Sequence, residues 1–216
     1  MNKTLHYLFD PLCGWCYGAT PAVSQVLETP GIVVKMLPTG LFSGEGARAM
    51  DDAFADFAWS NDQRIERLTR QSFTQRYRER VLGDRHQLFD SGPATLALTA
   101  VSRTDPAREL ETLKAIQRAR YVDGRDVTSL AALASLLEGL GLTQATAKVA
   151  HPDADLLSAN AVRIRQAQAL MREFSARGVP TLIAEGGAKR WMLDPGAAYS
   201  NPRALVRMLD IPANLL

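Results

Sequence analysis

Two cysteines are the residues of this sequence whose type and spacing most clearly indicate chemistry. They are the only cysteines in a chain of 216 residues, and they lie together in the segment Cys13-Gly14-Trp15-Cys16. One pair cannot supply the four or more cysteines of a disulfide-stapled scaffold, nor the four thiolates of a structural zinc site. The C-x-x-C spacing instead suits thiol–disulfide exchange, in which one thiol attacks and the other resolves.

The expected position of this pair at the start of a helix gives the two thiols different roles. Unpaired N–H groups and the positive end of the helix dipole stabilise a thiolate at a helix N-terminus. Cysteines in such positions have pKa values of about 3.5–7.5, against about 8.5 for a free thiol. We therefore expect Cys13 to be exposed and to attack a substrate disulfide, and Cys16 to be more buried and to resolve the mixed disulfide.

The cysteine pair also admits two other interpretations. A C-x-x-C segment can be half of a zinc site, but the histidines His6, His86 and His151 do not lie at finger-like spacing from it. Two ordinary core cysteines are the second interpretation. The glycine between the thiols and the expected helix start favour redox chemistry, so we predict no metal site.

Short apolar runs at both ends of the chain predict the elements that position the thiols. A strand over residues 5–9 precedes the cysteines, a helix over residues 14–28 contains Cys16, and a second strand covers residues 32–37. Strand, helix and strand in this order predict a βαβ unit with a parallel pair. Near the other end, residues 181–184 and 188–193 flank a tight turn and predict a hairpin.

The middle of the sequence has a different, helical pattern over residues 46–177. Ser60 begins an S-x-x-Q segment, which predicts a helix start with a capping box, and Pro93 suits the first position of another helix. The fold class is therefore α/β. We expect one α/β domain, formed by residues 1–45 and 178–216, interrupted by a helical insertion domain, with a cleft between the two parts.

The segments at the two ends resemble those of a known family. A strand, C-x-x-C and a helix containing Pro21 resemble the thioredoxin superfamily, and Gly178-Val179-Pro180-Thr181 before a strand resembles its cis-proline loop. The long helical insertion is similar to that of the DsbA-like branch. Residues 9–18 resemble the signal-less bacterial group of protein-disulfide isomerases, to which FrnE-type proteins are related.

This resemblance implies a thioredoxin-like fold with a large all-helical insertion, as in DsbA-like proteins. It implies that Pro180 is cis and lies beside the two cysteines. It also implies that the backbone of Val179, together with Pro180, binds an extended substrate.

Three residues near the thiols are candidate modulators of the site: Asp10, Gly14 and Trp15. Gly14 and Trp15 stand where periplasmic DsbA enzymes carry Pro-His, so we expect a weaker oxidant and a better electron donor than DsbA. We also expect Trp15 to be exposed and to contact substrate. Asp10 either acts on Cys13 as a neighbouring carboxylate or forms the turn before the cysteines, which we favour.

These observations predict a thiol–disulfide oxidoreductase that acts as a reductase or protein-disulfide isomerase on disulfide-containing proteins or small thiols. Two other functions stay open. One is a glutathione-dependent isomerase or transferase of the kappa or 2-hydroxychromene-2-carboxylate isomerase type, in which serine stands at the position of Cys13. The other is a non-enzymatic peptide-binding chaperone. We expect no cofactor, only redox exchange with glutathione or protein dithiols.

Charge and hydropathy exclude several partners. The chain has 25 Lys and Arg against 23 Asp and Glu, a net charge of +2, which does not predict nucleic-acid binding. No secretory signal and no membrane-spanning run is visible, so we expect a cytoplasmic protein without a membrane partner. The sequence indicates no oligomeric state.

Overall fold

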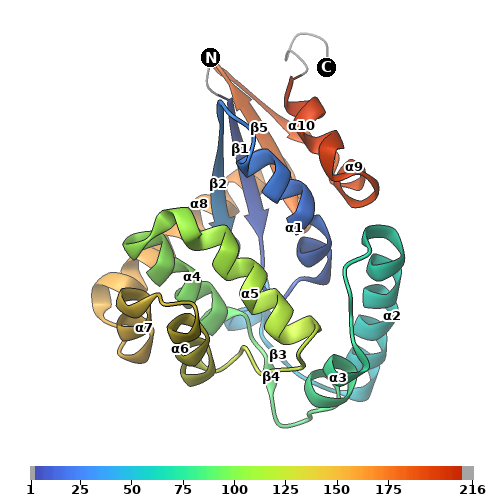
Figure 1. The fold of residues 1–216 in the computed structure, drawn as a ribbon, viewed down its shortest axis with the longest axis vertical. Coiled ribbons are helices and arrows are strands. Elements are labelled where there is room, and N and C mark those ends of the chain that lie inside the picture. The colour runs from blue at the N-terminus through green and yellow to red at the C-terminus, as the bar shows by residue number, and fades with distance from the viewer. Residues whose placement is uncertain (1–2, 211–216) are drawn as a thin grey trace.

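The computed structural model describes residues 3–210 and is built on a mixed four-stranded sheet (Figure 1). The strand order is β2 (Ile32–Pro38), β1 (Lys3–Phe9), β5 (Thr181–Gly186) and β6 (Lys189–Leu193). β1 is parallel to β2 and antiparallel to β5, and β5 is antiparallel to β6. The predicted βαβ unit and hairpin are confirmed, and they form one sheet.

Alternate side chains of β1 enter hydrophobic cores on the two faces of the sheet. Tyr7 and Phe9 belong to the larger core, which includes Val23 of α1 (Gly14–Leu27). Leu8 belongs to a smaller core with Leu170 of α8, on the opposite face. This two-residue period places α1 and α8 on opposite sides of the strand that leads to the cysteines.

Helices fill most of the chain between β2 and β5. The longer ones are α2 (Asp52–Thr69), α4 (Gly92–Thr104), α5 (Glu109–Tyr121), α6 (Leu130–Gly139), α7 (Thr143–Ala150) and α8 (Ala154–Glu173). The short elements are η1 (Gly44–Gly46), α3 (Gln75–Tyr77), a π-helical turn η2 (Arg78–Leu82), η3 (Pro106–Arg108) and the two-residue strands β3 (Arg48–Ala49) and β4 (Leu88–Phe89). After the hairpin come α9 (Gly196–Ser200) and α10 (Pro202–Asp210), which pack on α1.

The helix start predicted at Ser60 is wrong. Ser60 lies inside α2, which begins eight residues earlier. The Asp51 carboxylate accepts a hydrogen bond from the backbone N–H of Phe54 at 2.7 Å and caps the helix there. An aspartate cap followed by aromatic residues therefore sets the start of α2, and the S-x-x-Q match is coincidental.

A buried ion pair joins the helices to the sheet. Arg163 of α8 pairs with Glu109 of α5, and both side chains are almost fully buried. The same guanidinium donates to the carbonyl oxygen of Met36 in β2 at 2.9 Å and to Thr99 Oγ1 in α4 at 3.1 Å. One side chain thus fixes α4, α5 and α8 against the sheet edge.

The predicted division of the chain into residues 1–45, 46–177 and 178–216 stays a prediction. The strands of the four-stranded sheet lie in the first and last of these parts, and helices α2 to α8 lie in the middle part. Residues 211–216 of the last part lie outside the described residues.

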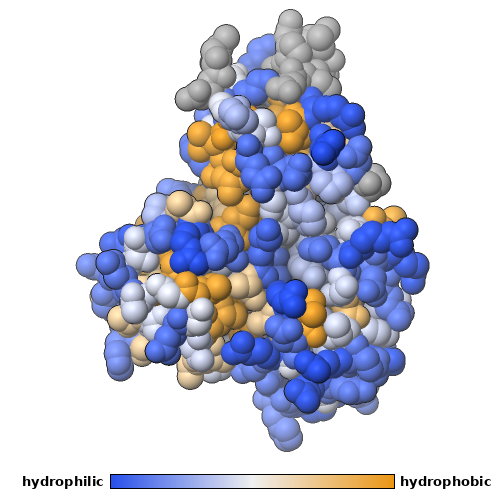
Figure 2. Space-filling model, in the orientation of Figure 1, coloured by the Kyte–Doolittle hydropathy of each residue, from blue (hydrophilic) through white to orange (hydrophobic). Residues whose placement is uncertain are grey.

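Hydrophilic residues cover most of the face seen in Figure 2, with smaller hydrophobic patches between them. Within residues 3–210, no helix combines the length and the apolar character that crossing a bilayer requires.

Candidate active site

The two cysteines lie where β1 ends and α1 begins. Cys13 is the residue before the first helical turn, with extended backbone angles, and its carbonyl oxygen accepts the N–H of Tyr17 at 3.0 Å. Its own N–H donates to the carbonyl oxygen of Asp10 at 3.1 Å, which closes the connecting turn. Cys16 follows within the first turn of α1. The Cys13 side chain therefore stands at the positive end of the helix dipole.

The expected exposure of Cys13 is wrong, although the expected order of burial is right. Cys13 is 7% exposed and Cys16 is 0% exposed. The Cys13 thiol lies against the loop before β5, where it donates to the carbonyl oxygen of Val179 at 3.5 Å. That loop is distant in sequence, so the local sequence pattern around Cys13 does not predict that the loop buries the thiol.

The Cys16 thiol is held in its protonated form. Burial raises the pKa of Cys16 well above its ordinary value, and the hydrogen bond with Cys13 raises it further. The backbone of Cys16 is also fixed, because its carbonyl oxygen accepts Tyr7 Oη at 3.0 Å and Thr20 Oγ1 at 2.9 Å. The two thiols thus differ in environment, as an attacking and a resolving thiol require.

The loop predicted to contain a cis-proline lies beside Cys13. The peptide bond between Val179 and Pro180 is cis, and Pro180 is buried immediately before β5. The backbone of Val179 is the one expected to bind substrate, and its carbonyl oxygen accepts a hydrogen bond from the Cys13 thiol. The structure therefore brings together Cys13, Val179 and Pro180 from opposite ends of the chain.

Asp10 organises the turn that carries Cys13. Its side chain is fully buried, and Oδ1 accepts the N–H of Leu12 at 2.9 Å. Oδ2 accepts the N–H of Phe42 at 3.1 Å and Ser91 Oγ at 2.7 Å. Burial raises the pKa of Asp10, against the lowering effect of these hydrogen bonds. The turn-forming role that we favoured fits this geometry, with the added function of tying two other loops to the turn.

Gly14 and Trp15 have steric roles at the start of α1. A Cβ atom on Gly14 would overlap Asp62 Oδ1 and lie 3.1 Å from Ile65 Cδ1, so glycine allows α2 to approach the thiols. Trp15 is half-buried rather than exposed, because its ring packs 5.0 Å from the ring of Tyr199. The prediction of an exposed tryptophan is wrong, but the indole still lines the adjoining pocket.

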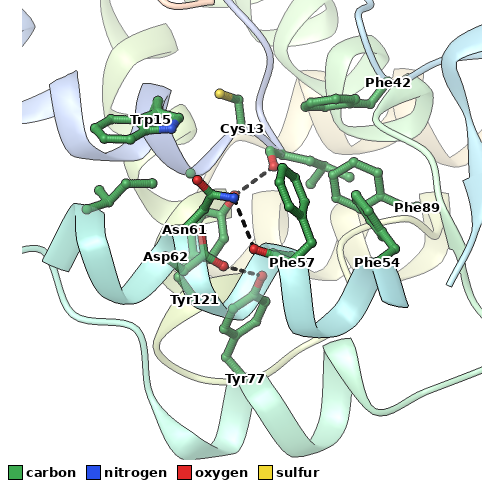
Figure 3. Close-up of a pocket in the computed structure, with 14 residues that line it drawn as sticks. Cys13, Trp15, Phe42, Phe54, Phe57, Asn61, Asp62, Tyr77, Phe89 and Tyr121 are labelled. Atoms are coloured by element: carbon green, nitrogen blue, oxygen red, sulfur yellow. Dashed lines mark hydrogen bonds between the residues drawn. The ribbon is translucent and has the colours of Figure 1, made fainter. Parts of the chain in front are cut away.

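A pocket of about 180 Å³ opens beside Cys13 (Figure 3). Its walls come from the start of α1, from α2, and from segments near β2, α3, β4 and the end of α5. The lining residues are Leu12, Cys13, Gly14, Trp15, Phe42, Phe54, Phe57, Ala58, Asn61, Asp62, Ile65, Tyr77, Phe89 and Tyr121. The lining is mostly aromatic and aliphatic, and this pocket occupies the position at which we expected a cleft.

Most of these lining residues were not predicted from the sequence. The helical spacing of Phe54, Ala58, Asp62 and Ile65 places them on one face of α2, and this spacing is the signal that could have identified them. Tyr121 donates from its hydroxyl to the carbonyl oxygen of Leu12 at 2.8 Å. It thereby joins α5 to the turn before Cys13.

Asp62 is a buried acid in the pocket wall. Its Oδ2 accepts Tyr77 Oη at 2.9 Å. Burial raises the pKa of Asp62 to about 7, and the opposing effects of Tyr77 and of the Arg120 charge are smaller. Arg120 is itself buried, with its guanidinium 5.3–5.8 Å from the rings of Tyr77, Phe89 and Tyr121. A cation thus lies behind the aromatic wall.

No group of three or more His, Cys, Asp or Glu side chains suited to a metal ion occurs among residues 3–210. His6 pairs with Glu185 across β1 and β5 at 2.8 Å, as a core histidine, and takes no part in the cysteine site.

Comparison with known proteins places the chain in a family. Residues 4–199 match the model of the DSBA-like thioredoxin domain. The chain belongs to this family. Its predicted fold, a thioredoxin-like fold with a large helical insertion, is therefore confirmed. No curated protein sequence matches the chain.

Solved structures agree with this assignment. The cytosolic disulfide reductase DsbM from Pseudomonas aeruginosa is 32% identical, with a TM-score of 0.87 over 99% of this chain and 100% of that one. The structure of the same reductase with GSH has a TM-score of 0.83, at 32% identity, over 96% of this chain and 97% of that one. Pseudomonas aeruginosa DsbA, at 15% identity and a TM-score of 0.55 over 97% of this chain and 81% of that one, shares the fold.

Proposed function

We propose that this DSBA-like protein is a thiol–disulfide oxidoreductase that reduces disulfides with Cys13 and Cys16. The observation that carries the proposal is the position of Cys13 at the N-terminus of α1, in contact with Val179, with a more buried Cys16 one turn behind. The resemblance to a cytosolic disulfide reductase over the whole chain supports the reductive direction. A glutathione-reduced cytoplasm, the proposed location, also favours reduction.

The reaction follows from the difference between the two thiols. The Cys13 thiolate attacks one sulfur of the substrate, a Cys13–substrate disulfide forms, and the other half leaves as a thiolate that takes up a proton. Cys16 then loses its proton and attacks the Cys13 sulfur, which releases the second thiol and leaves a Cys13–Cys16 disulfide. Two further thiols, such as two glutathione molecules, reduce this disulfide and are themselves oxidised to one disulfide. The structure of the related reductase with GSH supports a small thiol in this last role.

The burial of Cys16 keeps the order of these steps. Since burial raises the pKa of Cys16, this residue stays a thiol while Cys13 attacks. The backbone of Val179 and Pro180 is then available to an extended substrate once the mixed disulfide has displaced the Cys13 contact.

The proposal is tested by equilibrating the protein in buffers with increasing ratios of glutathione disulfide to glutathione and then counting its free thiols. We expect reversible conversion of two thiols into one intramolecular disulfide, together with reduction of insulin by the dithiol form. The Cys13→Ser variant should lose insulin reduction and should keep the fold, as judged by circular dichroism. A wild-type protein without a reversible Cys13–Cys16 disulfide would contradict the proposal.

A further inference from the structure

The pocket beside Cys13 has the size and lining of a site for a single ring. Its volume is about 180 Å³, and an apolar cavity of about 150 Å³ is known to hold one benzene molecule. Figure 3 shows the rings of Phe42, Phe54 and Phe89 gathered on one side of the pocket, with Cys13 at its edge. Aromatic rings favour offset or edge-to-face contact with another ring.

The rings are already arranged in such contacts among themselves. The centroid of Phe89 lies 4.8 Å from that of Phe42 and 5.0 Å from that of Phe54, at interplanar angles of 57° and 64°. Phe57 lines the same pocket and is 65% exposed, which is unusual for so large an apolar side chain. An apolar group that enters the pocket would cover part of this ring.

We propose that this pocket binds an uncharged aromatic ring attached through one carbon to the attacked sulfur, so that small arylmethyl disulfides are preferred substrates. This inference rests on the proposed function of Cys13. The ring fills the pocket next to Cys13, while the remainder of the disulfide stays outside. Glutathione itself carries two carboxylates and an ammonium group. Each of these charged groups would lose its hydration if it were buried in this lining, which is energetically unfavourable.

The lining of the pocket disfavours a negative charge on the ring. Asp62 and Asn61 form its polar side, and the Asp62 carboxyl accepts a hydrogen bond from Tyr77 deep in the wall. A ring carboxylate would lose its hydration in this mostly apolar lining. At pH 8 it would also meet the Asp62 carboxylate, which already interacts with the charge of Arg120 behind the wall. The pocket therefore suits an uncharged ring.

Three mixed disulfides of glutathione test the inference on the full-length, pre-reduced protein. Their second halves are benzyl thiol, 4-(mercaptomethyl)benzoate and 2-mercaptoethanol, in all of which sulfur is bonded to a CH₂ group. The protein dithiol becomes one disulfide, and each substrate yields its thiol plus glutathione, which chromatography quantifies after an acid quench. At pH 8 we expect the second-order rate constant of this single oxidation for the benzyl compound to exceed that for the hydroxyethyl compound about tenfold or more, with the benzoate close to the latter.

A matched pair of variants locates the effect. Ala58 lines the pocket, whereas Ala53 is exposed on the same helix outside it. Ala58→Leu should reduce the benzyl-to-hydroxyethyl ratio toward one, and Ala53→Leu should leave this ratio as in the wild type. Equal rates for the benzyl and hydroxyethyl compounds in the wild type, or a preference that survives Ala58→Leu, would overturn the inference.

A binding measurement separates this inference from the proposed function. S-benzylglutathione and S-(2-hydroxyethyl)glutathione are thioethers, which the protein cannot reduce. Calorimetric titration should show about tenfold tighter binding of the benzyl compound, with the difference lost in Ala58→Leu. Equal binding of the two thioethers would overturn the ring site. Selective binding without reduction of any disulfide would instead contradict the proposed function.

Discussion

The Cys13 thiol lies 3.5 Å from the carbonyl oxygen of Val179, although 166 positions separate the two residues in the sequence. The sheet makes this contact possible. β1, which leads to Cys13, pairs with β5, which follows Val179, in a register that sets Leu8 opposite Thr181. The redox site is therefore assembled by pairing between the two ends of the chain, and the helices in between supply its other wall.

The close approach of α2 to the thiols depends on Gly14. In Gly14→Ala, the new Cβ would overlap the buried Asp62 carboxyl. We expect the free energy of unfolding to fall by about 1–3 kcal/mol, measured by urea denaturation. Gly139→Ala is the matched control, since a Cβ there meets no atom within 4 Å, and it should be neutral or stabilising by up to ~1 kcal/mol.

A double-mutant cycle identifies the cause of this loss. In an Asp62→Ala background the carboxyl is absent, and only the contact of the new Cβ with Ile65 Cδ1 remains. The loss of unfolding free energy caused by Gly14→Ala should therefore be smaller in this background. The same cost in both backgrounds would show that the clash with Asp62 is not the reason for the glycine.

The elements that carry the cysteines were predictable because their signals are local. The apolar runs of β1 and β2 end at prolines or glycines, and the hairpin of β5 and β6 has a Gly-Gly turn. The cover over Cys13 was not predictable in this way. It comes from Val179, whose distance to Cys13 depends on strand pairing across the whole chain.

Asp62 shows why most of the pocket was not predicted. An aspartate on an amphipathic helix is ordinarily exposed, and only its spacing from Ile65 indicates that it shares the buried face of α2. Its partner Tyr77 lies on the next helical segment, and no local pattern joins the two residues. The predicted start of α2 was wrong for a local reason. The sequence offers two capping residues, Ser60 and Asp51, and the helix is capped by Asp51.

Asp62 should make stability depend on pH. Burial raises its pKa in the folded protein from 3.8 to about 7, so the folded form binds more protons than the unfolded chain between these values. Its contribution to stability is complete below about pH 4 and is lost as the pH rises through 7. The free energy of unfolding of the wild type, minus that of Asp62→Asn, should fall by roughly 3–4 kcal/mol between pH 4 and pH 8.

Chemical denaturation of both proteins at pH 4, 6 and 8 measures this difference. Subtraction removes the titration of the other acids, which the two proteins share. Parallel pH profiles for the wild type and Asp62→Asn would contradict the assignment of a raised pKa to Asp62.

Gln71 compensates for a proline inside α1. Pro21 has no N–H to donate to the carbonyl oxygen of Tyr17 one turn earlier, and Gln71 Nε2 donates to that oxygen at 3.2 Å. Gln71→Ala should therefore destabilise the protein by about 0.5–1.5 kcal/mol in thermal or urea unfolding. In a Pro21→Ala background the helix can make its own bond, so the same substitution should cost less. An equal cost in both backgrounds would argue against this compensation.

The central claim is that Cys13 attacks and Cys16 resolves, and trapping of the mixed disulfide tests it most directly. Reduced Cys16→Ser and Cys13→Ser proteins are treated with glutathione disulfide, and the adduct is located by peptide mass spectrometry. We predict one stable glutathione adduct on Cys13 in Cys16→Ser, and the Cys13–Cys16 disulfide without adduct in the wild type. In Cys13→Ser, the buried Cys16 should react far more slowly. Faster formation of an adduct on Cys16 than on Cys13 would contradict the account.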